Sequence, residues 1–302
     1  MNHLRDAVDQ YLELRRALGF RLQHLNWLVP DFLRYLEAHG AEFITVRRAL
    51  DWARQPSDAH PSWWAKRLSM VRGLARHLHA EDPRHQVPPV DLIPAQVRRR
   101  APVLFSASQI AALLRAARRL KTTLRAATHE TLFGLLAATG MRIGEAIRLD
   151  RDDIDWKQQL LVVRHSKFDK SREVVLHPSV MAALRRYTQV RDHCCPRPRS
   201  PAFFISRRGT RLIYNNAHRT FRMLTRTAGL PSGRPHDLRH SFAVATLLHW
   251  YRKGVDVDAW MPRLSTYLGH AAPESTYWYL TAAPELMAIA RRKLERAGGL
   301  AS

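Results

Sequence analysis

The sequence predicts a mainly helical fold with one small β-sheet, divided into two domains. Apolar residues recur with the helical period along most of the 302 residues. Two β-branched runs, at 159–165 and 173–177, flank a short polar turn and predict a hairpin. Residues 81–103 hold five prolines and separate the two helical regions. We therefore expect a helical domain at 1–85, a linker at 86–104 and a second domain at 105–302.

Four short helices are expected in the first domain. They cover residues 2–18, 22–39, 46–53 and 63–80. Thr45 and Ser62 are the expected N-caps of the last two helices. Pro30 lies inside the second helix and predicts a kink or a later start.

The proline-rich linker is expected to be extended, because proline removes backbone donors and disfavours helix. It ends in a basic run, Arg98, Arg99 and Arg100. These arginines are expected either to touch DNA phosphates or to be solvated.

Helical structure should resume at Ser106, which has Gln109 at the capping-box position. The later elements are expected in the order helix, hairpin, helix, short strand and helix, at 125–139, 159–177, 178–192, 203–206 and 214–227. His236 and Arg239 are also expected on a helix, and another helix should end at Leu268. A last amphipathic helix is expected at 284–298. It either docks on a neighbouring subunit or packs back on its own domain.

The charge balance points to a polyanionic partner such as nucleic acid. Forty-nine Lys and Arg against 26 Asp and Glu leave a net charge of +23. Most of this excess, +18, follows residue 100. Ribosomal and membrane-surface proteins share such an excess, and a merely solvated basic surface is the plain alternative.

Cysteine usage and hydropathy indicate a cytoplasmic protein without a membrane span. The two cysteines are adjacent, at Cys194 and Cys195, which is neither a disulfide framework nor a spaced metal knuckle. The first twenty residues are charged and amphipathic, unlike a signal peptide. No apolar run reaches the roughly 18 residues that a span requires. Neither a metal nor another cofactor is expected, since no carboxylate cluster is apparent.

Three motifs carry the functional prediction. The first is TGMRIGE around Arg142, and the second is HDLRHSFA, with His236, Arg239 and His240. The third is Leu-Gly-His at 268–270, followed nine residues after the histidine by Tyr279. Together they resemble the catalytic boxes of the tyrosine recombinases, the phage-integrase-like enzymes. The match is tight from about 130 to 280 and loose over the first hundred residues.

The resemblance implies a catalytic set. Arg142 and Arg239 would clamp the scissile phosphate, because a guanidinium donates two parallel hydrogen bonds and keeps its charge. His236 and His270 would support the chemistry, and Tyr279 would be the nucleophile, with Tyr277 as its rival. The hairpin would supply a lysine as general acid. Lys167 has the expected place, but Ser166 and Phe168 replace the usual glycines, so Lys170 remains an alternative.

Further residues follow from the same resemblance. Glu145 would buttress the site, and His240 would be a structural neighbour. DNA contacts are expected from the basic residues Arg172, Arg219, Arg222 and Arg226, although the last three equally suit a plain exposed helix face. The first domain would be the SAM-like, helical core-binding domain that clamps DNA, and residues 105–302 the catalytic domain.

The implied activity is site-specific recombination through a 3′-phosphotyrosine intermediate, by an integrase or transposase of a mobile element or a resolvase. The expected partners are double-stranded DNA and further copies of the chain, from dimer to tetramer, with related recombinases of the same element as additional partners. Two alternatives share the basic surface. A type IB topoisomerase would relax DNA that lacks any recombination site, and a non-catalytic DNA-binding regulator would bind without cutting.

Overall fold

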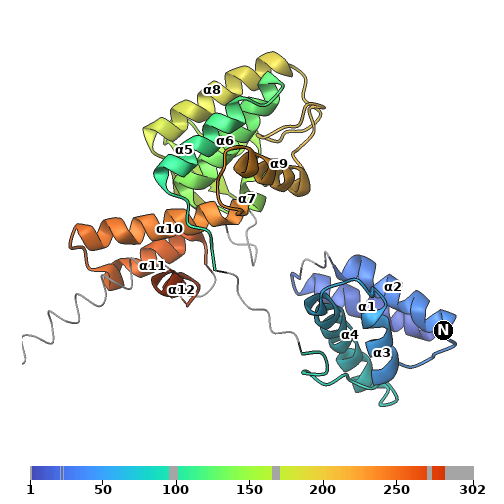
Figure 1. Ribbon diagram of the computed structural model, residues 1–302. Coiled ribbons are helices and arrows are strands. Elements are labelled where there is room, and N and C mark those ends of the chain that lie inside the picture. The colour runs from blue at the N-terminus through green and yellow to red at the C-terminus, as the bar shows by residue number, and fades with distance from the viewer. Residues whose placement is uncertain are drawn as a thin grey trace, which may run out of the picture. The chain divides into compact units, whose positions relative to one another are not determined.

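The structure is a computed structural model. It describes residues 2–20, 22, 24–94, 101–164, 171–270 and 274–282. The chain divides into two compact units, residues 1–100 and 101–302 (Figure 1). Each unit has its own hydrophobic core, so each is described separately.

The N-terminal unit is a bundle of four helices, α1 (Asn2–Ala17), α2 (Leu25–Ala38), α3 (Val46–Arg54) and α4 (Pro61–Glu81) (Figure 1). Their apolar faces meet in one core, in which Leu28, Leu36 and Trp52 are almost completely buried. The indole of Trp52 donates to Asp31 Oδ2 at 3.1 Å. Burial of these faces stabilises helices that would be marginal in isolation.

The helix boundaries follow local chemistry. Thr45 caps α3 as predicted, with its hydroxyl accepting from the amide of Arg48 at 3.2 Å. The cap predicted for α4 was wrong. His60 takes the N-cap position, and its Nδ1 accepts from the amide of Ser62 at 3.2 Å. Helix α2 begins at Leu25, three residues later than expected, and contains Pro30.

The first part of the proline-rich segment packs against α4. The guanidinium of Arg72 donates to the carbonyls of Pro88, Pro89 and Val90 at 2.7, 2.6 and 3.1 Å. Ile93 is buried in the core of the same unit. Proline has no backbone N–H to donate to a β-ladder, but its carbonyl can still accept a hydrogen bond, and Arg72 donates to these carbonyls. The basic run 98–100 lies outside the described residues.

The C-terminal unit begins with α5 (Ala107–Arg118), α6 (Thr123–Thr139) and α7 (Ile143–Arg148). A 3₁₀ turn at Arg151–Asp153 leads into an antiparallel sheet of β1 (Ile154–Asp155), β2 (Leu160–Val163) and β3 (Arg172–Val175), in that order. The pairing of Val163 with Arg172 confirms the predicted hairpin. Strand β1, only two residues long, was not predicted.

The described part of this unit continues with five helices: α8 (Pro178–Cys194), α9 (Tyr214–Thr227), α10 (Pro235–Arg252), α11 (Val257–Leu268) and α12 (Glu274–Ala282). The bounds of α9 are those predicted. The strand expected at 203–206 is reduced to two isolated bridges, which join Asp150 to Ala202 and Ile205 to Arg211. Within the described ranges, no helix combines the length and apolar character needed to cross a bilayer.

Helix α6 lies at the centre of the C-terminal unit, in contact with α5, α8 and α10. Its residues Leu132 and Phe133 are completely buried in the larger of the unit's two cores. The smaller core joins α10, α11 and α12, which lie together on one side of the unit (Figure 1). The predicted catalytic motifs come from the region where these two cores meet.

Candidate active site

A sharp turn between α6 and α7 places Arg142. Gly140 ends α6 with φ +62°, a left-handed conformation that glycine adopts without strain. A Cβ at this position would lie 2.5 Å from the ring of Phe242, so the turn also requires the absence of a side chain. Two residues later, Arg142 occupies the N-cap position of α7.

Glu145 binds two arginines from different elements. Its carboxylate accepts from Arg142 Nη1 at 2.9 Å, and from Arg172 at 2.8 Å to Nη2 and 3.2 Å to Nη1. Its second oxygen also accepts from the backbone amide of Arg142 at 2.9 Å. The Glu145 side chain is only 2% exposed. Its burial opposes ionisation, but the hydrogen bonds and charge of Arg172, with those of Arg142, lower the pKa of Glu145 to about 2.

The same two arginines hold the turn that follows α11. Arg142 Nη2 donates to the carbonyl of Gly269 at 3.0 Å, and Arg172 Nε donates to the carbonyl of Tyr267 at 3.0 Å. Gly269 has φ +70°, and a Cβ there would lie 2.8 Å from the Arg172 guanidinium. Arg172 was predicted to contact DNA. In the structure its side chain is only 12% exposed and contacts protein groups instead.

Arg239 is buried in the first turns of α10, and its residue is 1% exposed. Its Nη1 donates to the carbonyl of Gly140 at 2.8 Å. Its Nη2 has no hydrogen-bond partner of good geometry within the described part of the chain, although the guanidinium lies close enough to the Tyr279 hydroxyl to interact with it. Burial and the neighbouring charge of Arg142 lower the pKa of Arg239 to about 10, so it stays charged at neutral pH.

Three histidines surround this arginine. The rings of His236 and His240 meet edge to face at 4.7 Å. Burial, together with nearby positive charge, lowers the pKa of both to about 4 and that of His270 to about 3. All three rings are therefore neutral at pH 7 and can each offer one donor and one acceptor.

The two tyrosines of α12 differ in environment. Tyr279 is 2% exposed and belongs to the core shared by α10 and α11, whereas Tyr277 is 43% exposed. The Tyr279 ring stacks on His270 at 6.0 Å and meets His240 at 5.5 Å. Burial raises the pKa of Tyr279, and the charges of Arg239 and Arg142 oppose that rise.

Thr276 connects α12 to the Leu-Gly-His turn. It is completely buried, and its Oγ1 lies 2.6 Å from His270 Nδ1. Sequence reasoning missed this residue. No motif marks a threonine between the histidine and the tyrosine, although its i, i+3 spacing to Tyr279 places both on one helix face.

A hollow of about 530 Å³ opens beside the cluster. Its lining includes Arg142 and His236 together with Arg148, Arg234 and Tyr214. Glu145 is the only carboxylate among the described lining residues, and it is already paired with two arginines. The surplus positive charge makes the hollow suited to an anion.

Other predicted residues lie elsewhere or outside the described ranges. Arg219, Arg222 and Arg226 are exposed on α9. Lys167 and Lys170 fall outside the described residues, as do Arg98, Arg99 and Arg100 and the expected tail helix at 284–298. Among the described residues, no group of three His, Cys, Asp or Glu side chains is placed to hold a metal ion.

The comparison with known families agrees with this geometry. The model of the phage integrase family matches residues 104–285, which include every described member of the cluster. The chain belongs to the phage integrase family. It is a tyrosine recombinase, one of a class of enzymes that transfer DNA strands.

Relatives of the phage integrase family extend the similarity over the whole chain. A protein of Sinorhizobium fredii described as an integrase/recombinase, y4rB, is 44% identical over 98% of both chains. Tyrosine recombinase XerD of Mycobacterium tuberculosis is 32% identical over 90% of this chain and 87% of its own. The N-terminal unit, which lies outside the family match, is thus also shared with relatives.

Solved structures of integrases and recombinases share the fold. The Tn1549 transposon integrase in complex with a circular intermediate DNA has a TM-score of 0.67 at 16% identity and covers 96% of this chain and 99% of its own. The XerA recombinase has a TM-score of 0.53 at 22% identity, with 97% and 98% covered. These likenesses confirm the predicted fold class, a mainly helical chain with a small sheet.

Proposed function

We propose that this recombinase cuts and rejoins DNA at a specific site by attack of Tyr279 on a phosphodiester, which forms a 3′-phosphotyrosine. The observation that carries the proposal is the buried Arg239. Its Nη1 is fixed by the Gly140 carbonyl, its Nη2 has no well-formed hydrogen bond among the described residues, and its guanidinium lies close to the Tyr279 hydroxyl. A buried charged donor without an acceptor is costly. A phosphate oxygen would satisfy it, at a point next to the ring of Tyr279.

Arg142 and Arg239 act as the phosphate clamp. Their charges exceed what Glu145 neutralises, because that carboxylate is shared with Arg172. The transition state carries more negative charge on the equatorial oxygens than the ground state does. Fixed guanidinium groups therefore stabilise it preferentially. Loss of one such donor typically costs about 10²- to 10³-fold in rate.

The chemical step forms a bond between Tyr279 Oη and phosphorus and breaks the bond from phosphorus to the 5′ oxygen. The phenol proton leaves to a neutral acceptor, and the His236 and His270 rings offer such nitrogens because they are unprotonated at pH 7. The 5′ oxygen takes up a proton from a lysine of the β2–β3 hairpin, Lys167 or Lys170. The phosphotyrosine conserves the bond energy for rejoining.

The wider assembly follows from the same chemistry. Double-stranded DNA is the partner, held by the N-terminal unit as the core-binding domain and by the catalytic domain through basic residues such as Arg219, Arg222 and Arg226. Exchange of strands between two sites requires several copies of the chain, from dimer to tetramer, in which the segment 284–302 docks on a neighbour. An integrase or transposase of a mobile element is the biological setting that we infer.

The test is covalent capture on nicked duplexes whose arms are randomised, so that the site need not be known. Cleavage near the nick releases a short fragment and traps the protein on the DNA. We expect wild type and Tyr277→Phe to give a band that survives denaturing electrophoresis, and Tyr279→Phe to give none. Sequencing of the captured DNA then identifies the site.

The other outcomes distinguish the alternatives. A band lost only in Tyr277→Phe would replace the nucleophile but keep the reaction class. Relaxation of plasmids that lack the selected site would indicate a type IB topoisomerase. Tight DNA binding without any covalent band would indicate a non-catalytic regulator and would refute the proposal.

A further inference from the structure

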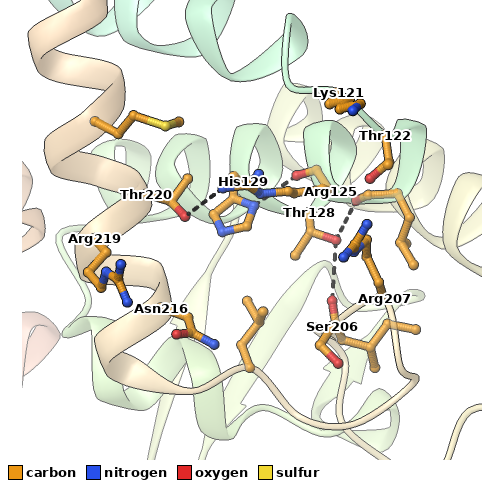
Figure 2. A pocket seen from close by; sticks show the side chains of 14 residues that line it. Lys121, Thr122, Arg125, Thr128, His129, Ser206, Arg207, Asn216, Arg219 and Thr220 are labelled. Carbon is orange, nitrogen blue, oxygen red and sulfur yellow. Dashed lines mark hydrogen bonds between the residues drawn. The ribbon is translucent and has the colours of Figure 1, made fainter.

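A second cavity lies in the C-terminal unit, between the start of α6, the start of α9 and the 205–212 segment. Its volume is about 580 Å³ (Figure 2). Four cationic side chains line it, Lys121, Arg125, Arg207 and Arg219, and no Asp or Glu is among its described lining residues. None of the four makes an ion pair within the described part of the chain. The cavity therefore concentrates unneutralised positive charge.

Two buried polar atoms in this cavity have no hydrogen-bond partner within the described residues. They are His129 Nε2 and Thr122 Oγ1. His129 is 5% exposed, and in Figure 2 its ring lies between Thr220 and Thr128. Buried polar groups are usually satisfied, so two orphans in one cavity call for an occupant.

The free nitrogen of His129 is an acceptor. Nδ1 lies 2.8 Å from the carbonyl of Arg125, and a carbonyl can only accept, so Nδ1 carries the proton. Burial and the charge of Arg125 disfavour a second proton, since the pKa of His129 is lowered. Nε2 thus presents a lone pair and requires a ligand that carries an N–H or O–H donor.

The start of α6 supplies an anion site at the other end of the cavity. The helix begins immediately after Thr122, whose hydroxyl makes no capping bond. Its first-turn amides have no intrahelical acceptor and carry the positive end of the helix dipole. Lys121 and Arg125 flank this terminus, which suits a phosphate group.

We propose that this cavity binds a free nucleoside monophosphate. The phosphate lies at the α6 terminus beside Lys121 and Arg125, and the base lies against the apolar walls formed by Leu124, Ile205 and Leu212. A polar hydrogen of the nucleoside donates to His129 Nε2. The volume exceeds what a phosphate ion alone needs, and His129 is only 5% exposed, so a ligand has to enter the cavity to reach Nε2.

The test is isothermal titration calorimetry of the full chain with each of the four ribonucleoside 5′-monophosphates, with inorganic phosphate and adenosine as partial ligands. We expect at least one nucleotide to bind with one-to-one stoichiometry, at least tenfold more tightly than either partial ligand. Arg207→Gln and Arg219→Gln should each lower the affinity for this nucleotide at least fivefold. The neighbouring exposed residues Arg208 and Arg222 do not line the cavity, so Arg208→Gln and Arg222→Gln should stay within twofold.

Three results would overturn the proposal. One is no binding by any nucleotide at millimolar concentration, and another is equal loss in the lining and control variants. The third is displacement of the nucleotide by a 30-base-pair duplex, together with an equal loss of duplex affinity and nucleotide affinity in Arg207→Gln. That result would make the cavity part of the DNA-binding surface. Thr122→Val leaves all charges in place and should lower the affinity for the nucleotide without changing the fold.

Discussion

The hydroxyl of Thr276 lies 2.6 Å from Nδ1 of His270, and both belong to the region that also holds Tyr279. The contact joins α12, which carries Tyr279, to the end of α11, where the carbonyls of Gly269 and Tyr267 accept from Arg142 and Arg172. It also engages Nδ1 of His270, so Nε2 is the nitrogen that this contact leaves open. Thr276 therefore orients the His270 ring.

Thr276→Val should lower the rate of covalent complex formation about tenfold to hundredfold, because His270 loses the hydroxyl that orients its ring. DNA affinity should change less than twofold. Thr276→Ser keeps the hydroxyl and should restore the rate to within about threefold. Thr266→Val removes an exposed hydroxyl of α11 and is the matched control. Equal activity of the valine and serine variants would contradict the positioning role.

Arg172→Lys should lower cleavage about tenfold or more while the protein still binds DNA. Lysine keeps the charge but cannot reproduce the paired hydrogen bonds to Glu145 together with the bond to Tyr267. Arg151→Lys, at the exposed ion pair with Asp192, is the control and should be nearly neutral. A loss of DNA affinity without loss of single-turnover cleavage would favour the direct DNA contact that the sequence suggested.

Gly269→Ala should be more harmful than Gly254→Ala, although both glycines have left-handed φ values, +70° and +69°. The shared backbone strain costs about 1–2 kcal/mol. At Gly254 no atom lies within 4 Å of the added Cβ, whereas at Gly269 the Arg172 guanidinium lies at 2.8 Å. Chemical denaturation and covalent capture should therefore show a stability loss in both variants but a cleavage loss only in Gly269→Ala. Wild-type cleavage by Gly269→Ala would show that the position of Arg172 does not matter.

Glu145 should stabilise the fold in a pH-dependent manner. Its folded pKa of about 2 lies below the ordinary 4.5, so the folded state binds fewer protons between these values. The ionised Glu145 contributes about 3 kcal/mol to the free energy of unfolding. This contribution is fully present above pH 4.5 and is lost as the pH falls toward 2. The difference in unfolding free energy between wild type and Glu145→Gln should narrow progressively below pH 4.5. Glu173→Gln, at an exposed position of β3, should show little difference at any pH; a constant difference for Glu145→Gln would refute the charge-based explanation.

The sequence predicted the elements whose signals are local. The capping box of Ser106 and Gln109, the glycine stop at Gly140 and the bounds of α9 depend on residues within a few positions of each other. Strand β1 is too short to show alternation, and the preference for His60 over Ser62 as a cap depends on the ring's orientation.

The candidate active site shows the same contrast between residues marked by local motifs and contacts that have no local signal. Arg142, Arg239, His270 and Tyr279 stand in short motifs and were predicted by resemblance. The pairing of Arg172 with Glu145 spans 27 positions, and the contact of Thr276 with His270 joins residues six positions apart on different elements, so neither has a sequence signal. The burial of Tyr279 and the exposure of Tyr277 likewise depend on which face α12 turns toward α10 and α11. The catalytic roles themselves stay predictions.

Tyr279 lies against His270 and His240 of its own chain, so we expect one chain to hold a complete active site. The most direct test of this claim mixes two variants that each lack one part of the site. Tyr279→Phe and Arg142→Gln should be mixed in equal amounts and incubated with the captured nicked duplex. We predict no more covalent complex than either variant gives alone, because no chain in the mixture carries both the nucleophile and the clamp. Recovery of a substantial fraction of wild-type cleavage would show that the tyrosine of one chain attacks in the site of another, and would contradict the account.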